Sequence, residues 1–166
     1  MQTNSYPHHA CLDAAGERLF VAAPGLDLSG GPPAFVLALD ANTGELLASH
    51  ELEYPNHNAI PSPDGQEVWT SQGRSPGFVV VLDAETLDEH HRITVGDAPA
   101  EVTFDSSGRY ALVCNTGSAS VTAIDVATRT VAAELTVGMT PVGAWPGHRE
   151  AVRRQRGGPN ALGHRC

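Results

Sequence analysis

A repeat of about 42 residues constrains the fold of this chain more than any other feature. Its clearest copy, residues 96–137, holds four short runs rich in β-branched and apolar residues, separated by turn residues. These runs are residues 101–104, 110–115, 121–125 and 131–137. Residues 95–99 open the copy with a Val-Gly-x-x-Pro pattern that returns at 137–141, where another copy begins. Each copy is therefore predicted to form four antiparallel β-strands.

The same landmarks occur in the same order twice more upstream. Every copy has a turn glycine, which is Gly16, Gly65 or Gly108. Every copy also ends its third strand on an aspartate, and Asp40, Asp83 and Asp125 lie 43 and 42 residues apart. The first copy predicts strands at 8–12, 19–23, 35–40 and 46–52, with a Gly/Pro-rich loop at 24–33. The second predicts strands at 58–60, 67–71, 78–83 and 91–95.

Several of these residues resemble the YVTN-type β-propeller repeat. They are Asp64-Gly65, Val113-Cys114-Asn115, Ser120-Val121 to Ile124-Asp125, Thr128, and Val137-Gly138 with Pro141. Cys114 departs from the small residue that is usual in the family. The resemblance covers about residues 5–147 and is closest at 96–145. It implies an all-β fold of radially arranged blades, WD40-like in architecture and common on exported bacterial proteins, but no particular reaction.

The fourth copy begins on schedule and then breaks off. Residues 140–147 match the start of a unit, whereas 148–166 have no alternating pattern, Asp-Gly turn or strand-ending aspartate. We therefore divide the chain into a partial propeller at 1–147 and an aberrant Arg-rich tail at 148–166, which is predicted to be disordered or poorly packed. A frameshifted or truncated reading frame would explain the switch, and a functional basic tail is the alternative.

About three blades plus the start of a fourth cannot close a ring, because propellers generally have four to eight. An open arc exposes an apolar blade face at each end. Three outcomes follow from this count: a chain that is unstable alone, a homodimer that closes the propeller, or a fragment of a longer protein.

Composition excludes several classes of partner. The net charge is -9, and all ten basic residues are arginine, half of them after residue 148. Nucleic acid is therefore not expected to bind the acidic body. No apolar run is long enough for a membrane span, and no signal segment is recognisable at the N-terminus. The chain alone leaves localisation unknown, whereas the family resemblance favours a periplasmic or extracellular protein.

Histidines are the main candidates for a functional site. His8 and His57 each lie eight residues before their turn glycines, so they occupy equivalent positions at the start of the innermost strand, with His9 next to His8. That strand lines the channel of a propeller, and neutral imidazoles gathered at its mouth suit copper or zinc, or a haem iron. The structural alternative is a set of polar residues that hydrate a water-filled channel.

The spacing of these histidines also resembles two known kinds of propeller. It is similar to the copper ligands of nitrous-oxide reductase, although that family adds ligands from later blades and a separate copper domain. His pairs at this position also resemble the inner strands of phosphogluconolactonase-type propellers, so the pattern is not specific to copper.

Other candidates carry weaker signals. His50, His90 and His91 fall on outer strands or turns and are expected to face solvent. Glu101 is at the inner position of the third copy and could act as an acid or base, but the sequence places no partner beside it. Cys11 and Cys114 are expected to be buried thiols, and with Cys166 they make an odd count without zinc-site spacing. The repeated aspartates are expected to stabilise turns.

The sequence therefore favours a non-catalytic propeller segment that acts as a binding scaffold for a protein or small-molecule ligand not identified by the sequence. The first alternative is the metal-binding or redox portion of an oxidoreductase-like propeller, with His8, His9 and His57 as ligands of copper or haem. A lactonase-like hydrolase is the second.

Overall fold

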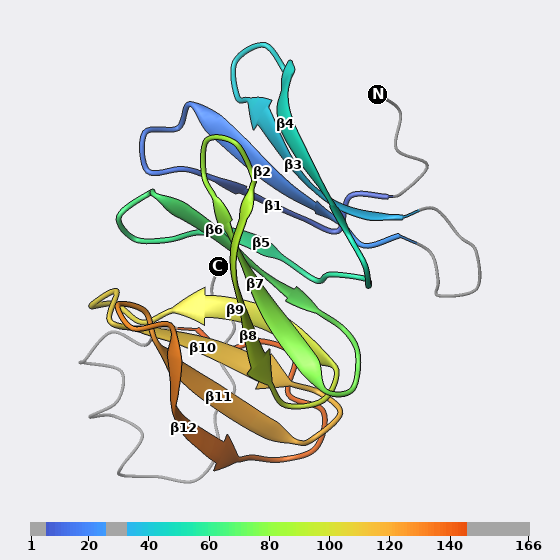
Figure 1. Ribbon diagram of the computed structural model, residues 1–166, viewed down its shortest axis with the longest axis vertical. Helices are drawn as coiled ribbons and strands as arrows, with labels where there is room; N and C mark the ends of the chain where they lie inside the picture. Colours follow the sequence, from blue (N-terminus) through green and yellow to red (C-terminus); the bar gives the residue numbers. More distant parts are fainter. Residues whose placement is uncertain (1–5, 26–32, 146–166) are drawn as a thin grey trace, which may run out of the picture.

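Three four-stranded antiparallel sheets follow one another along the chain in the computed structural model, which describes residues 6–25 and 33–145 (Figure 1). The first sheet contains β1 (His9–Leu12), β2 (Arg18–Ala23), β3 (Ala34–Asp40) and β4 (Leu46–Leu52). The second contains β5 (Ala59–Pro61), β6 (Glu67–Gln72), β7 (Gly77–Asp83) and β8 (Glu89–Val95). The third contains β9 (Pro99–Phe104), β10 (Tyr110–Asn115), β11 (Ser120–Asp125) and β12 (Thr130–Thr136). Every strand pairs with its sequence neighbours, which confirms the predicted units.

The turns use the residues that mark the repeat. Gly65 has a φ of +72°, a left-handed conformation that glycine adopts without a steric penalty, and Gly16 and Gly108 are similar. The Asp83 carboxylate accepts hydrogen bonds from the backbone N–H groups of Glu85 and Thr86, each at 2.8 Å. Asp40 and Asp125 make matching bonds in their turns. The turn-stabilising role predicted for these aspartates is therefore confirmed.

The twelve strands begin and end within two residues of their predicted bounds, and three differences bear on the candidate site or on the fourth unit. β1 begins at His9 rather than His8, although the His8 N–H still donates to Ala22 C=O at 2.9 Å. β5 begins at Ala59 rather than Asn58, and the Asn58 backbone carbonyl accepts from the Thr70 hydroxyl at 2.6 Å. No strand is formed at 140–145, where the inner strand of a fourth unit was expected. That strand would pair with a second strand of its own sheet, and the sequence after residue 147 has no strand pattern.

The start of the fourth unit nevertheless contacts the third sheet. The Glu101 N–H donates to Val142 C=O at 3.3 Å, and the Thr116 hydroxyl donates to Pro141 C=O at 2.9 Å. The prediction of a disordered tail at 148–166 lies outside the described residues. Within the described ranges there is also no helix long and apolar enough to cross a membrane.

Two apolar cores hold the sheets together. The first lies between the first and second sheets, and its largest side chains include Phe20, Val36, Val68 and Leu82. The second lies between the second and third sheets and includes Trp69, whose ring meets the edge of Phe104 with centroids 5.5 Å apart. Each sheet thus buries apolar side chains against the next, and this stacking arranges the sheets in an arc (Figure 1).

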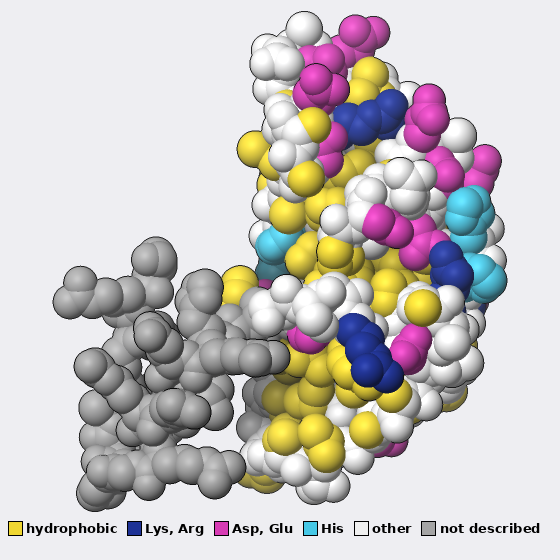
Figure 2. Space-filling model, turned by 90° about the vertical axis from the view of Figure 1, so that its left-hand side faces the viewer, with side chains coloured by type: hydrophobic (Ala, Val, Ile, Leu, Met, Phe, Trp, Pro, Cys, Tyr) yellow, Lys and Arg dark blue, Asp and Glu magenta, His cyan; other side chains and the backbone are white. Residues whose placement is uncertain are grey.

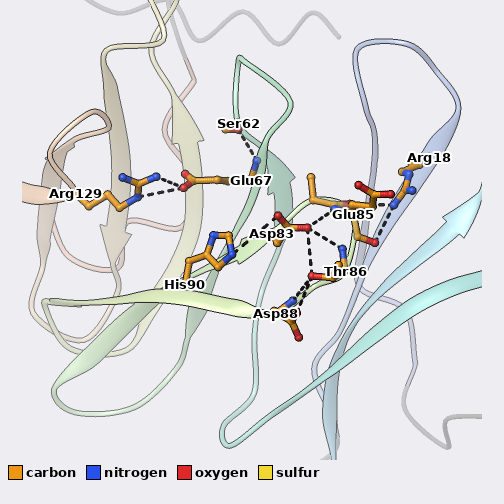
Figure 3. A network of polar contacts seen from close by, with 10 residues as sticks. Arg18, Ser62, Glu67, Asp83, Glu85, Thr86, Asp88, His90 and Arg129 are labelled. Carbon is orange, nitrogen blue, oxygen red and sulfur yellow. Dashed lines mark hydrogen bonds and ion pairs between the residues drawn. The ribbon is translucent and has the colours of Figure 1, made fainter.

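An arginine also crosses each sheet-to-sheet interface, as Figure 3 shows. Arg18 of the first sheet donates to the backbone carbonyls of Ala84 and Glu85, both at 3.1 Å. Arg129 of the third sheet donates to the Glu67 carboxylate of the second through Nε, at 3.1 Å, and through Nη2. Each contact joins the start of a strand, β2 or β6, to a turn that is more than 60 residues away in sequence, and so helps to set the angle between the sheets.

Candidate functional site

The inner strand β1 lies beside β5, and β5 lies beside β9, so the first residues of these strands are on the same side of the molecule (Figure 1). Aligned on the turn glycines, His8 is equivalent to His57 and to Ala100. The next position holds His9, Asn58 and Glu101. The repeat therefore brings three imidazoles and one carboxylate into the same part of the molecule.

His8 and His57 are in direct contact. Their ring centroids lie 4.3 Å apart, with an edge-to-face angle of 63° between the rings. His8 Nδ1–H also donates to the backbone carbonyl of His57 at 2.9 Å, which leaves its Nε2 as an acceptor. The prediction that these two histidines come together from adjacent sheets is confirmed.

Glu101 completes the group from the third sheet. One carboxylate oxygen of Glu101 lies 4.0 Å from His57 Nδ1, which is beyond hydrogen-bonding distance. His57 Nδ1 and His9 Nδ1 are both buried, and neither makes a hydrogen bond within the described residues. Two ring nitrogens of half-buried side chains are thus shielded from solvent near a carboxylate, without a hydrogen-bond partner among the described residues.

Burial keeps two of the imidazoles neutral. It lowers the pKa of His57 below its ordinary value of 6.5, and the nearby His8 and His9 lower it further. Burial also lowers the pKa of His9, an effect opposed by Glu101 and reinforced by His8. The pKa of the Cys114 thiol is raised, by burial first and by Glu101 second. At neutral pH the imidazoles of His9 and His57 are therefore held in their neutral form next to Glu101.

Asn58 has a different role from its equivalents. Its side-chain amide donates to Val102 C=O at 2.7 Å, and its carbonyl accepts from Val102 N–H at 3.1 Å. The buried amide thus pairs with a strand of the next sheet as another backbone strand would. This contact holds β9, and with it Glu101, against the end of β5.

The other candidates lie away from this group. His90 and His91 are exposed on β8, as expected, and His90 is 4.0 Å from the Asp83 carboxylate. His50 is half-buried on β4, where it lies 4.0 Å from Glu89. Cys114 is buried as predicted, whereas Cys11 is only half-buried because it lies on the first strand of the first sheet.

The metal hypothesis gains no support from this geometry. Among residues 6–25 and 33–145, no three His, Cys, Asp or Glu side chains are grouped so that they could hold a metal ion. His8 and His57 instead meet edge to face, with one nitrogen of His8 bonded to backbone. A ligand set of His8, His9 and His57 for copper or haem therefore stays a prediction.

Comparison with solved structures decides the architecture. The chain is similar to hydrazine synthase of Kuenenia stuttgartiensis, with a TM-score of 0.72 and 23% identity over 85% of this chain. It is also similar to the periplasmic gluconolactonase of Pseudomonas aeruginosa, with a TM-score of 0.68 and 21% identity over 86% of this chain. The β-propeller domain of Myceliophteria thermophila Cps50 (Swd1) matches with a TM-score of 0.63 and 14% identity over 81% of this chain. The fold is a β-propeller.

The three sheets are therefore blades 1, 2 and 3, and the inner strands line the central channel. The chain spans only 39%, 43% and 43% of the lengths of these three structures. No family model and no curated protein matches the sequence. At these identities the likeness shows the fold and leaves the activity open.

Sequence reasoning found the histidines but not their partner. The repeat does place Glu101 at the position equivalent to His9 and Asn58, and this offset was the available signal. The offset does not give the angle between blades. This angle decides whether side chains from blades 1, 2 and 3 come close enough to interact. The Asn58–Val102 pairing is part of what sets that angle.

Proposed function

We propose that this chain is a segment of a YVTN-type β-propeller that acts as a binding scaffold without catalysis, with its ligand site at the channel mouth formed by His8, His9, His57 and Glu101. The observation that supports this best is the pair of buried ring nitrogens, His9 Nδ1 and His57 Nδ1, that make no hydrogen bond within the described residues. Buried polar atoms are normally paired, so two unpaired ones beside a carboxylate suit a ligand that supplies the missing partners. The family resemblance favours a bacterial, exported setting.

The charge of the site favours a ligand rich in hydrogen-bond donors. With His9 and His57 neutral at pH 7, their ring nitrogens can accept hydrogen bonds, and Glu101 adds an acceptor with negative charge. The chain as a whole is acidic. A primary ammonium group suits such a site. Its three N–H donors can bond to the two ring nitrogens and to Glu101, and its positive charge suits the carboxylate and the acidic chain.

Two other functions remain as alternatives. A copper or haem site would use the same histidines but needs them to turn toward a common centre. A lactonase-like hydrolase would use the carboxylate and imidazole that stand 4.0 Å apart, Glu101 and His57, as acid and base. The gluconolactonase likeness bears on the fold only, at 21% identity.

One set of titrations distinguishes the scaffold, the metal site and the hydrolase. Imidazole ¹⁵N–¹H spectra of the full chain would be recorded with ethanolammonium chloride, zinc chloride or glucono-δ-lactone as separate probes. We expect ethanolammonium to shift the His9 and His57 signals saturably, and Glu101→Gln to weaken that binding at least about tenfold, since a charge-assisted hydrogen bond is lost. His91→Gln, an exposed control, should leave the binding unchanged.

Each other result contradicts the scaffold proposal. Saturable shifts with zinc and none with ethanolammonium would favour the metal site. If the parent hydrolyses the lactone faster than the Glu101→Gln variant does, the result would favour the hydrolase. No saturable shift with any probe would remove the channel mouth as a ligand site.

A further inference from the structure

A row of leucines crosses one face of blade 1. Leu12 pairs across the strands with Leu19, Leu19 with Leu39, and Leu39 with Leu46, and directly opposed residues share a face of a sheet. Leu12 is 50% exposed and Leu46 is 37% exposed. This face, the front of blade 1, points away from blade 2, because the residues that pack on blade 2 are the alternate ones such as Phe20 and Val36.

Blades 2 and 3 bury the inner part of the equivalent row, whereas its members on the outermost strand, Glu89 and Val131, are exposed as Leu46 is. In blade 2 it contains Val68 and Leu82, both 0% exposed and packed against blade 1. In blade 3 it contains Phe104, Ala111 and Ile124, which are at most 8% exposed and packed against blade 2. The front of a blade is thus built to be covered by the blade before it, and blade 1 has no such neighbour among the described residues.

The opposite end of the arc has the complementary face. Leu112 pairs with Ala123, and Val121 with Leu135, on the back of blade 3. The equivalent pairs in blade 2 are Trp69 with Val81 and Val79 with Ile93, all buried beneath blade 3. On blade 3, however, Leu135 is 58% exposed, and every residue of β12 is exposed. Figure 2 shows hydrophobic side chains at the lower end of the molecule, where blade 3 lies in Figure 1.

We propose that these two faces bind each other between two copies of this chain, the front of blade 1 in one copy covering the back of blade 3 in the other. The interface would continue the one that the chain already makes twice within itself, with the same register and the same kinds of residue. Length agrees with a second copy as the occupant. One chain spans 39–43% of the solved propellers described above, so two copies supply most of one such ring.

The internal interface also predicts a specific contact. Trp69 on the back of blade 2 meets Phe104 on the front of blade 3. By register, Leu112 is equivalent to Trp69, and Leu12 is equivalent to Phe104. Leu112 of one copy is therefore expected to pack on Leu12 of the other.

Two-fold symmetry makes this contact twice, because each copy offers one front and one back. The result is a closed ring, in which the His8, His9, His57 and Glu101 groups of both copies face one channel. A head-to-tail arrangement that failed to close would instead give an open polymer of many copies.

The test uses sedimentation velocity and native mass spectrometry on the full 17.4 kDa chain. Two single variants, Leu12→Arg and Leu112→Glu, each place an unpaired charge in the proposed contact. The control is Val131→Glu. Val131 is 47% exposed, but it pairs with Ile124 and therefore lies on the other face of blade 3 from Leu135. Circular dichroism would verify that each variant is folded. If Leu112→Glu does not fold, Leu135→Glu, which is also on the back of blade 3, would replace it.

We expect the parent and the Val131→Glu control to be dimers, and each of the other variants alone to be a monomer, with the dimer Kd raised at least about a hundredfold. Mixing Leu12→Arg with Leu112→Glu should restore a dimer that contains one copy of each, because one interface then joins Arg to Glu and the other is unaltered. A monomeric parent, an open polymer, single variants that stay dimeric, a control that dissociates, or a mixture that stays monomeric would each overturn the proposal.

Discussion

At the scale of single residues, burial at the channel mouth determines the pKa of two histidines, His9 and His57. Burial lowers the pKa of both His57 and His9 below 6.5. For His9 burial outweighs the opposing charge of Glu101, and for His57 the neighbouring His8 and His9 add to the effect of burial. A histidine whose pKa is lowered by folding binds protons more readily in the unfolded chain. Its neutral form therefore contributes stability above pH 6.5, and this stability is lost as the pH falls toward the lowered pKa.

These lowered pKa values predict that stability depends on pH through the histidines of the channel mouth. The free energy of unfolding of the parent, from urea denaturation, should fall between pH 7.5 and pH 5.5. His57→Gln should make this fall shallower, because one of the groups with a lowered pKa is removed. His91→Gln, at an exposed position, should leave the slope unchanged. The lowered pKa values of Asp64, Asp83 and Asp105 act in a separate range, below their ordinary 3.8. Equal slopes for the parent and His57→Gln would show that His57 is not buried in this way.

At the scale of strands and turns, the interface between blades 2 and 3 combines an apolar core with one polar bridge. Glu67 is 7% exposed and accepts a hydrogen bond from Trp69 Nε1 at 3.0 Å. It also accepts from Arg129, as Figure 3 shows. The Glu67 N–H donates to the Ser62 hydroxyl at 3.0 Å. The arginine lies in the β11–β12 turn, so the bridge links the outer turn of blade 3 to the start of β6.

Removing the arginine should therefore destabilise the interface. Arg129→Met leaves the Glu67 carboxylate buried without its cation, and we expect a loss of about 2 kcal/mol. This is below the usual cost of breaking a buried pair because the Arg129 side chain is 32% exposed. The double variant Glu67→Gln/Arg129→Met should recover part of the loss, since the stranded charge is gone. Urea denaturation measures both, and a double variant no more stable than Arg129→Met would contradict the stranded-charge explanation.

At the scale of the whole molecule, the repeat predicted the three sheets and their order because strand pairing within a blade is local and follows alternation and turn residues. The His8–His57 contact could be predicted in the same way, from equal offsets within two copies. The Glu67–Arg129 pair and the approach of Glu101 to His57 could not, because both depend on the angle between blades. The strand expected at 140–145 is not formed, and the sequence after residue 147 lacks the alternating pattern that would predict its partner strand.

The central claim is that successive blades bring their inner strands to one channel mouth, and a nuclear Overhauser spectrum of histidine-labelled protein tests it most directly. The rings of His8 and His57 are separated by 49 residues in sequence and by 4.3 Å between centroids in the structure. We predict a cross-peak between their ring protons, and its loss in the His57→Gln variant. Absence of that cross-peak in a folded sample, or a cross-peak of either ring to His90 in its place, would contradict the arrangement of the blades and the site built on it.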